Sequence, residues 1–452
     1  MKKTTTLATL AFSFILVASP LAAMAASSNS GNSDFNYIPQ EIYQLASTQT
    51  VAGTNSPSFN PLTYCAGAGL VCYSPAFIRS AYDFPSTLTG AGETIVIVDA
   101  YGSPTIVNDL ALFDSFFGIP APPSFTVICP PGGCPTPSYV SNQGHFGGNP
   151  HGPFGWSIET SLDVEYAHAM APGAKIVLDV AQSSSGNDIN VAESSIIPMF
   201  PGAIMSQSFG IPEAAIHNNN AQVIQAENNY AMAASLGWTV FASAGDSGAT
   251  NGYATANALF PSSDPLVTSV GGTQGLPYPG GLAAGSCPST GSSCTPSGYG
   301  GEEVWNEPQY DAAGGGAPSL LFSGRSTPDV SYNAAVNGGV LVAWSACPSC
   351  IGATGPVFFI VGGTSAGSPQ WAAIAALAEQ AAARPLGSLN SAINAIGSSP
   401  AKYANDFHDI TFGNNQLIGT SVGFSAGPGW DGASGWGTPN VANLIPDLVS
   451  PP

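Results

Sequence analysis

The feature that most constrains this chain is the alternation of short apolar runs with helical patterns along its middle. The patterns predict helices over 157–170, 221–236 and 369–382, and buried strands over 94–98, 175–180, 203–206, 238–242 and 357–361. Apolar strands that alternate with helices are typical of a parallel sheet covered on both faces. We therefore predict an α/β fold whose ligand sites lie outside the carboxyl ends of the strands.

The 452 residues divide most simply into one large domain and an N-terminal region. We predict that residues 71–452 form a single domain and that residues 26–70 form an extended arm or a short pro-region. Residues 1–25 have two lysines, a short apolar run and a small-residue end, which indicate a signal peptide cleaved before Ala26. No later segment has the apolar length of a membrane span, so we expect a secreted, extracellular protein.

The chain is poor in charge, with 7 Lys and Arg against 27 Asp and Glu and a net charge of −20. So few cations argue against nucleic acid or an anionic membrane as a partner. Once its acids are protonated, the chain would carry only about +12, from its 7 Lys and Arg and 5 His. This composition predicts an acidic habitat; a neutral secreted protein with an uncharged polar surface is the alternative.

Eight cysteines fall into four close pairs: Cys65/Cys72, Cys129/Cys134, Cys287/Cys294 and Cys347/Cys350. An even number in an exported chain favours four local disulfides, although spacing does not fix their pairing. The last pair also has the spacing of a redox motif, but it lacks the strand-to-helix setting of thioredoxins. No His or further Cys lies near enough to complete a zinc site.

Three polar groups fall at strand ends or helix starts. Ser365 follows a strand and a glycine turn and precedes a helix, whose free N–H groups suit a nucleophile that creates an oxyanion. Glu159 and Asp163 are spaced i, i+4, so one helical face carries both carboxyls and their repulsion favours one proton between them. Asp246 follows a buried strand. A helix cap, a solvated acidic face and a turn aspartate are the respective structural alternatives.

As an ordered set, these motifs resemble the sedolisins, the serine-carboxyl peptidases, which are acid-active endopeptidases with a subtilisin-like fold. The resemblance extends from about residue 73 to 441 and also includes 260–261, 270–273, 327–331, 409–413 and 427–431. It implies that Ser365 is the nucleophile, Glu159 its general base and acid, Asp163 the partner of Glu159, and Asp246 the oxyanion donor. It also implies protein or peptide substrates, and we expect a monomer.

Elementary acid–base chemistry agrees with this resemblance. Histidine is protonated at about pH 3–4 and cannot accept the serine proton, whereas a carboxylate that titrates near pH ~4 can. An aspartate donates to an oxyanion only while protonated, so Asp246 also favours acid. Asp99, which closes the strand over 95–98, is expected to lie near Glu159 and to extend its hydrogen-bond chain. His168 is half a helical turn out of phase with Glu159 and is expected to face away.

The resemblance further implies one calcium ion near the C-terminus. The matching ligands are the carboxylates of Asp409 and Asp431 and the carbonyls of Ile410, Gly427 and Gly429. Calcium favours such all-oxygen sites, and protons should compete with it at low pH. Two ordinary turn aspartates are the alternative.

The sequence departs from the family in one respect and leaves two rival functions open. Sedolisins are usually made with a long prosegment, whereas only about 45 residues separate the predicted signal peptide from the region of resemblance. One rival is a subtilisin with an Asp99–His151–Ser365 triad, although His151 lies in a turn and Glu159 holds the helical position. The other is an inactive relative that binds a wall or matrix, although the four catalytic positions are intact.

Overall fold

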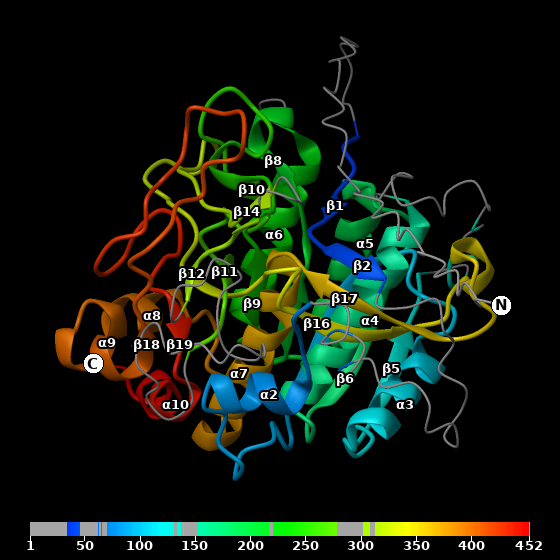
Figure 1. The fold of residues 1–452 in the computed structure, drawn as a ribbon. Helices are drawn as coiled ribbons and strands as arrows, with labels where there is room; N and C mark the ends of the chain where they lie inside the picture. Colours follow the sequence, from blue (N-terminus) through cyan, green and yellow to red (C-terminus); the bar gives the residue numbers. More distant parts are fainter. Residues whose placement is uncertain are drawn as a thin grey trace, which may run out of the picture.

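The computed structural model describes residues 34–45, 62, 65, 70–130, 133–136, 139, 152–216, 220–277, 302–307 and 312–451. Figure 1 traces this part of the chain. The predicted signal peptide, the Cys287/Cys294 pair, and His145, His151 and His217 lie outside the described residues.

A mainly parallel sheet forms the centre of the molecule, as predicted. Its strands run in the order β12-β11-β9-β7-β4-β6-β5, and β15 also pairs with β11. All neighbours are parallel except β11 and β12. The bounds are β4 Thr94–Ala100, β5 Phe125–Ile128, β6 Lys175–Ala181, β7 Ile204–Gln207, β9 Thr239–Ser243, β11 Thr268–Gln274, β12 Glu303–Val304 and β15 Val330–Asn333.

Helices cover both faces of this sheet because its strands bury both sets of side chains. In β4, Ile95 and Ile97 belong to one apolar cluster, and Val96 and Val98 belong to the other. The helices α3 (Ile106–Phe117), α4 (Pro153–Met170) and α7 (Gly367–Ala382) pack largely in the first cluster, and α5 (Gly186–Ile196) and α6 (Ala221–Ser235) pack in the second. The α/β fold with helices on both faces is therefore confirmed.

Helix α4 is buried along its whole length. Every residue from Phe154 to Met170 is inaccessible or nearly so, and Pro153 occupies the first helical turn, where its missing N–H costs nothing. The helix begins four residues earlier than the predicted 157, because Ser157 lies within the first turns and Gly152 is the cap. Carboxyl groups on such a helix can be accommodated only by other polar groups in the interior.

The strand before Ser365 belongs to a second sheet, in the order β2-β17-β16-β3. This sheet contains β2 Ile42–Leu45, β3 Cys72–Tyr73, β16 Gly339–Trp344 and β17 Val357–Gly362. Strands β16 and β17 pair antiparallel, so the apolar run over 357–361 is a buried strand outside the parallel sheet. Burial on both faces gives the same sequence pattern in either sheet, which is why the pattern alone did not separate them.

The described part of the N-terminal arm is extended and packs against the domain. Strand β1 (Ile38–Pro39) pairs with β8 (Phe209–Pro212), and β2 pairs with β17. Smaller elements complete the described chain: β10 Leu259–Phe260, β13 Asn306–Glu307, β14 Ala312–Ala313, β18 Phe407–His408, β19 Thr438–Pro439, α2 Pro75–Ala81, α8 Asn390–Gly397, α9 Pro400–Asp406 and α10 Val441–Val449.

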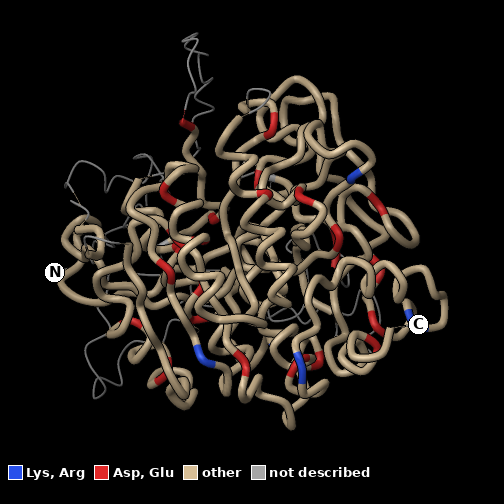
Figure 2. Tube along the Cα trace, turned by 180° about the vertical axis from the view of Figure 1, so that it is seen from behind, with Lys and Arg blue, Asp and Glu red and all other residues tan. Residues whose placement is uncertain are grey.

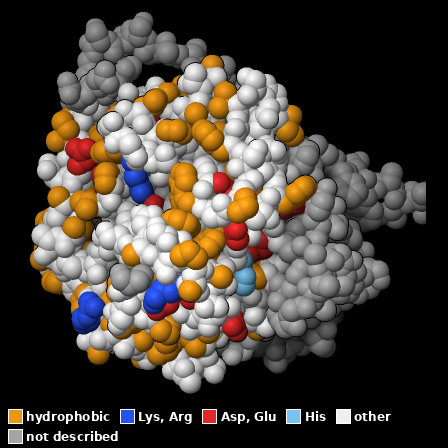
Figure 3. Space-filling view, turned by 90° about the vertical axis from the view of Figure 1, so that its left-hand side faces the viewer, with side chains coloured by type: hydrophobic (Ala, Val, Ile, Leu, Met, Phe, Trp, Pro, Cys, Tyr) orange, Lys and Arg blue, Asp and Glu red, His pale blue; other side chains and the backbone are white. Residues whose placement is uncertain are grey.

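Local disulfides and a weakly charged surface agree with the sequence. Cys65–Cys72, Cys129–Cys134 and Cys347–Cys350 are bonded. The described lysines and arginines are scattered along the trace (Figure 2), and on the face in Figure 3 charged side chains are few among uncharged and apolar ones. No described helix combines the length and apolar character needed to cross a membrane.

The packing of α7 gives a first prediction. Ile374 is fully buried in this helix, whereas Ile224, on α6, is 49% exposed. Truncation of Ile374 to Ala should lower the free energy of unfolding by about 2–5 kcal/mol, because it leaves a cavity in the core. Ile224→Ala is the matched control and should change it by less than about 1 kcal/mol. Urea denaturation followed by tryptophan fluorescence measures both, and equal losses would contradict the described packing.

Candidate active site

Ser365 lies in a tight turn between the second sheet and helix α7. Strand β17 ends at Gly362, Gly363 adopts a φ of +92°, and a short 3₁₀ turn over Thr364–Ala366 leads into α7. A side chain at 363 would be strained at this φ and would collide with neighbouring atoms, so glycine is required there. The turn holds Ser365 in a buried position just before the helix begins.

The Ser365 hydroxyl bonds directly to a carboxyl group from α4. Its Oγ donates to Glu159 Oε2 at 2.9 Å and lies 3.1 Å from the carbonyl oxygen of Ser208. Glu159 and Ser365 are 206 residues apart and both are fully buried. The structure therefore brings together the two side chains that were predicted to act as nucleophile and base.

Asp163 lies one helical turn beyond Glu159 and faces the same polar cluster. Its Oδ1 accepts a hydrogen bond from the Ser208 hydroxyl at 2.8 Å, and its carboxyl lies beside that of Glu159. Asp99, at the end of β4, is also fully buried and lies within electrostatic reach of Asp163 and Glu159. The i, i+4 spacing and the strand-end position thus place these carboxyls as expected.

Burial changes the acidity of the whole cluster. Removal from water raises the pKa of Glu159 well above its ordinary value, and the nearby charges of Glu41 and Asp163 raise it further. The pKa values of Asp163 and Asp99 are also raised, chiefly by burial. Since two adjacent carboxylates repel, the cluster retains protons in weakly acidic solution. One ionised member is tolerated when its neighbours stay neutral.

Asp246 approaches Ser365 from the end of β9. Its Oδ1 accepts hydrogen bonds from the backbone N–H and the hydroxyl of Thr364, at 2.7 and 2.9 Å, whereas its Oδ2 is buried without a partner. Burial raises the pKa of Asp246 to about 7. Below that pH, the unpartnered oxygen of a neutral Asp246 can donate a hydrogen bond to a further group in the site.

Two neighbours of the cluster were missed by the sequence reasoning. Ser208 follows β7 at its carboxyl end, so the strand-end rule that drew attention to Asp246 also applies to it. Glu41 comes from the N-terminal arm, is 7% exposed, and lies beside the Glu159 carboxyl. Burial, above all, raises the pKa of Glu41 to about 8. No periodicity or motif in the arm signals that it reaches the cluster.

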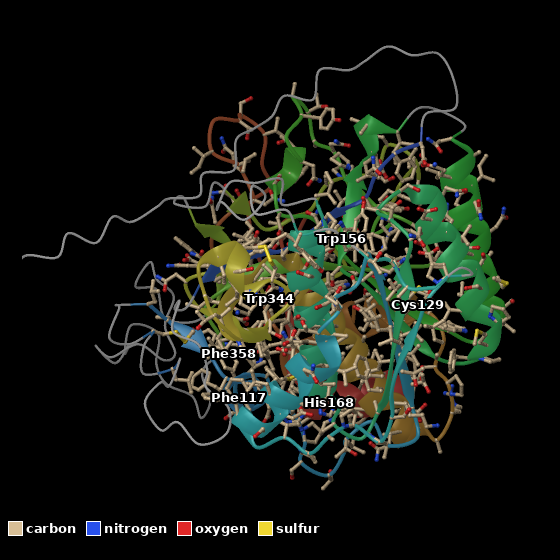
Figure 4. All side chains as sticks on the ribbon, turned by 90° about the vertical axis from the view of Figure 1, so that its right-hand side faces the viewer. Phe117, Cys129, Trp156, His168, Trp344 and Phe358 are labelled. Carbon is tan, nitrogen blue, oxygen red and sulfur yellow. A yellow bond between two sulfur atoms is a disulfide. The ribbon has the colours of Figure 1, made fainter. Side chains whose placement is uncertain are left out.

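Other titratable groups on α4 lie away from Ser365. His168 is 3.0 Å from the Pro120 carbonyl and 3.2 Å from Asp114, so it faces α3, as the helical phase predicted. Figure 4 shows Trp156 and His168 near opposite ends of α4. Glu165 accepts a hydrogen bond from the Ala343 N–H and is part of the packing against β16.

The predicted calcium ligands gather around one loop. The Asp409 carboxylate accepts from the Gly429 N–H at 3.1 and 3.2 Å, and Asp431 accepts from the Gly427 N–H at 3.0 Å. No group of three or more His, Cys, Asp or Glu that could hold a metal occurs in the described part of the chain. A cation here would thus need backbone carbonyls, such as that of Ile410. Asp409 and Asp431 are oxygen donors of the kind that calcium prefers.

Comparison with known proteins places this geometry in context. No family model matches the chain. It is 31% identical over 388 residues to kumamolisin of Bacillus sp. (strain MN-32), 28% over 399 residues to sedolisin of Pseudomonas sp. (strain 101), and 29% over 327 residues to human tripeptidyl-peptidase 1. These matches cover 84%, 82% and 65% of this chain, but it spans only 64%, 60% and 52% of the relatives' own lengths.

The fold is that of a subtilisin-like α/β protein with a serine paired to a carboxyl group. The structure of Pseudomonas sedolisin in complex with two molecules of pseudo-iodotyrostatin matches with a TM-score of 0.63 and 26% identity, over 84% of this chain and 99% of that one. Together with the sequence relatives, this match shows that the chain belongs to the sedolisin family of serine-carboxyl peptidases.

Buried carboxyls predict how stability depends on pH. Asp179, in β6, is 2% exposed, and burial raises its pKa to about 7. A carboxyl with a raised folded-state pKa contributes stability that is complete below its unfolded pKa, near ~4, and is lost as pH rises through the folded value. At pH 8, the free energy of unfolding of Asp179→Asn should therefore exceed that of the unchanged chain by up to about 4 kcal/mol. At pH 4 the two should be nearly equal.

Urea denaturation at pH 4 and pH 8 measures this difference. Both chains should carry Ser365→Ala, which prevents self-digestion of unfolded molecules. If Asp179→Asn raised the free energy of unfolding more at pH 4 than at pH 8, the predicted pH dependence would be wrong.

Proposed function

We propose that this protein is a secreted, acid-active serine endopeptidase that hydrolyses peptide bonds through an acyl-enzyme. The observation that carries the proposal is the 2.9 Å hydrogen bond from Ser365 Oγ to the buried Glu159 carboxyl. Membership of the sedolisin family and the likeness to kumamolisin and sedolisin support it. The predicted signal peptide and the disulfides support export, and residues 71–452 would form the catalytic domain.

In the proposed mechanism, Glu159 moves the proton. Ser365 Oγ attacks the substrate carbonyl carbon while ionised Glu159 takes the hydroxyl proton, which it then gives to the leaving amine. Glu159 can be ionised at low cost only while Asp163 beside it is neutral, and a neutral Asp163 can donate a hydrogen bond that orients the base. Acid conditions supply that proton, so acidity assists catalysis in two ways.

The second contribution of acid concerns the oxyanion. Neutral Asp246 would donate from its unpartnered Oδ2 to the negative oxygen of the tetrahedral intermediate, beside the backbone N–H of Ser365. Ionised Asp246 would repel that oxygen instead. Neither histidine in the described part of the chain is assigned to these roles. His168 contacts α3, and His408 lies on β18 near the predicted calcium loop.

The base and nucleophile are tested by digestion of acid-unfolded haemoglobin between pH 2 and pH 8. Ser365→Ala and Glu159→Gln should each lower kcat by about a thousandfold or more, because each removes a step that the other residues cannot perform. Glu165→Gln is the matched control on the same helix, and its kcat should stay within a fewfold of the unchanged enzyme. Normal cleavage by Glu159→Gln would exclude the proposed base.

The oxyanion donor is tested by the alkaline limit of the pH profile. Activity should fall as the pH rises through about 7, where Asp246 loses its proton. In Asp246→Asn, the amide donates at every pH. The pH at which activity falls should therefore be higher in this variant, even if its maximal rate is lower. Asp246→Ala should lose about 10²–10³ in kcat. If activity falls at the same pH in Asp246→Asn, another group sets the alkaline limit. Tryptophan fluorescence at each pH checks that both proteins are folded.

We also propose one structural calcium ion held by Asp409, Asp431 and the carbonyls of Ile410, Gly427 and Gly429. It would stabilise the fold by binding the native loop but not the unfolded chain. A chelator should lower the melting temperature of the unchanged protein, and added calcium should restore it. In Asp409→Asn this calcium-dependent shift should shrink, whereas Asp188→Asn, in the first turn of α5, should leave it intact. A melting temperature indifferent to calcium would refute the site.

A further inference from the structure

Thr364 contacts both the Asp246 carboxyl group and the turn that carries it. This threonine is fully buried and precedes Ser365 in the 3₁₀ turn before α7. Its Oγ1 accepts a hydrogen bond from the Gly245 N–H at 3.1 Å and donates one to Asp246 Oδ1 at 2.9 Å. The same Oδ1 accepts a second hydrogen bond, at 2.7 Å, from the Thr364 backbone N–H. One residue thus supplies two donors to one oxygen of the carboxyl group.

The direction of these hydrogen bonds follows from the groups that make them. The Gly245 N–H can only donate, so it occupies a lone pair of the Thr364 hydroxyl oxygen and leaves the hydroxyl proton for an acceptor. Asp246 Oδ1 is that acceptor. A second proton on Oδ1 would face the Thr364 hydroxyl proton. The acidic proton of neutral Asp246 is therefore favoured on Oδ2.

The second carboxyl oxygen of Asp246 is the one that remains available. Oδ2 is buried and has no hydrogen-bond partner among the described residues. A Cβ built on Gly363 would lie only 2.6 Å from it, so Oδ2 points at the turn that leads to Ser365. Because residue 363 is glycine, no side chain fills the space beside Oδ2.

The turn that carries Asp246 is also fixed by a contact that does not involve Thr364. The Ala249 N–H donates to the Asn415 carbonyl oxygen at 2.9 Å, and both residues are fully buried. Loss of the Thr364 hydroxyl should therefore change how the Asp246 carboxyl group is held, while the turn itself stays in the site.

From these contacts we propose that Thr364 is a positioning residue, whose hydroxyl holds the Asp246 carboxyl group so that Oδ2 carries the acidic proton toward the substrate oxyanion. This inference rests on the proposed peptidase function and on the oxyanion role of Asp246. It adds the group that orients the donated proton. Thr364 acts through Asp246 and needs no contact with the substrate.

The hydrogen bonds that orient the proton also make it easier to lose. Burial raises the pKa of Asp246 to about 7, whereas the two Thr364 donors favour the ionised carboxylate and lower the pKa. Without the hydroxyl, the pKa of Asp246 should be higher. Loss of Thr364 should thus lower the maximal rate and at the same time extend activity to higher pH.

Two substitutions test this pair of effects with an internally quenched peptide from a cleavage site in haemoglobin, between pH 2 and pH 9. Thr364→Val replaces the hydroxyl by a methyl group of similar size. At pH 4 its kcat should fall about tenfold with KM within about twofold, because the oriented proton acts on the transition state. The pH at which activity falls should rise by about one unit. Thr364→Ser keeps the donor and should restore both quantities.

A purely structural role of Thr364 predicts a different outcome. Thr364→Val also leaves the Gly245 N–H without its acceptor, and a less stable fold would lose activity at the same or a lower pH. Tryptophan fluorescence at each pH identifies the folded range. A folded Thr364→Val enzyme whose activity falls at an unchanged or lower pH overturns the inference. A further upward shift when Thr364→Val is added to Asp246→Asn also overturns it, because Thr364 would then act through another group.

Carboxyl titration separates this inference from the function on which it rests. In Ser365→Ala chains labelled with ¹³C at aspartate Cγ, the NMR signal that Asp246→Asn removes reports Asp246. Thr364→Val should raise its titration midpoint by about one pH unit without any catalysis. An unmoved midpoint overturns the inference and leaves the peptidase function standing. If the midpoint moves but the wild-type chain cleaves neither haemoglobin nor peptide, the peptidase function is wrong and the catalytic role of Thr364 falls with it.

Discussion

The hydrogen bond between the Ser365 hydroxyl and the Glu159 carboxyl is the contact on which the rest of the structure depends. It joins a fully buried helix to the turn before another, across more than two hundred residues of sequence. The central sheet, the packing of α4 beside α7 and the positive φ of Gly363 all serve to hold these two groups in one place. A hydroxyl and a carboxyl at this distance, shielded from water, interact far more strongly than they would at the surface.

Burial of that carboxyl links the site to the composition of the chain. Carboxyl groups at Glu159, Asp163 and Asp99 lie in the interior without cations to neutralise them, so each has a raised pKa. Such groups are tolerated in their neutral form and become destabilising when they ionise. These buried carboxyls therefore favour the fold at low pH, where they are neutral. In the proposed mechanism, the same protons would allow Asp246 to donate a hydrogen bond.

Much of this could be predicted from the sequence, and the failures have definite causes. The alternating apolar runs predicted the parallel sheet, and the resemblance of the motifs to the sedolisins implied which side chains would meet at Ser365. The strand before Ser365 was not separated from the main sheet, because burial on both faces leaves the same pattern in either sheet. Glu41 was missed because its position depends on how the arm docks, and pairing between distant strands leaves no local signal. Ser208 was a missed application of the strand-end rule.

The most direct test of the central claim is the covalent adduct of Ser365 with a ¹³C-labelled peptide aldehyde at pH 4, followed by NMR. Wild type and Glu159→Gln are compared as full-length chains under the same conditions. The account predicts a hemiacetal signal in the wild type and none in Glu159→Gln, since the hydroxyl cannot attack without a carboxylate to take its proton. An equally strong hemiacetal signal in a folded Glu159→Gln chain would contradict it.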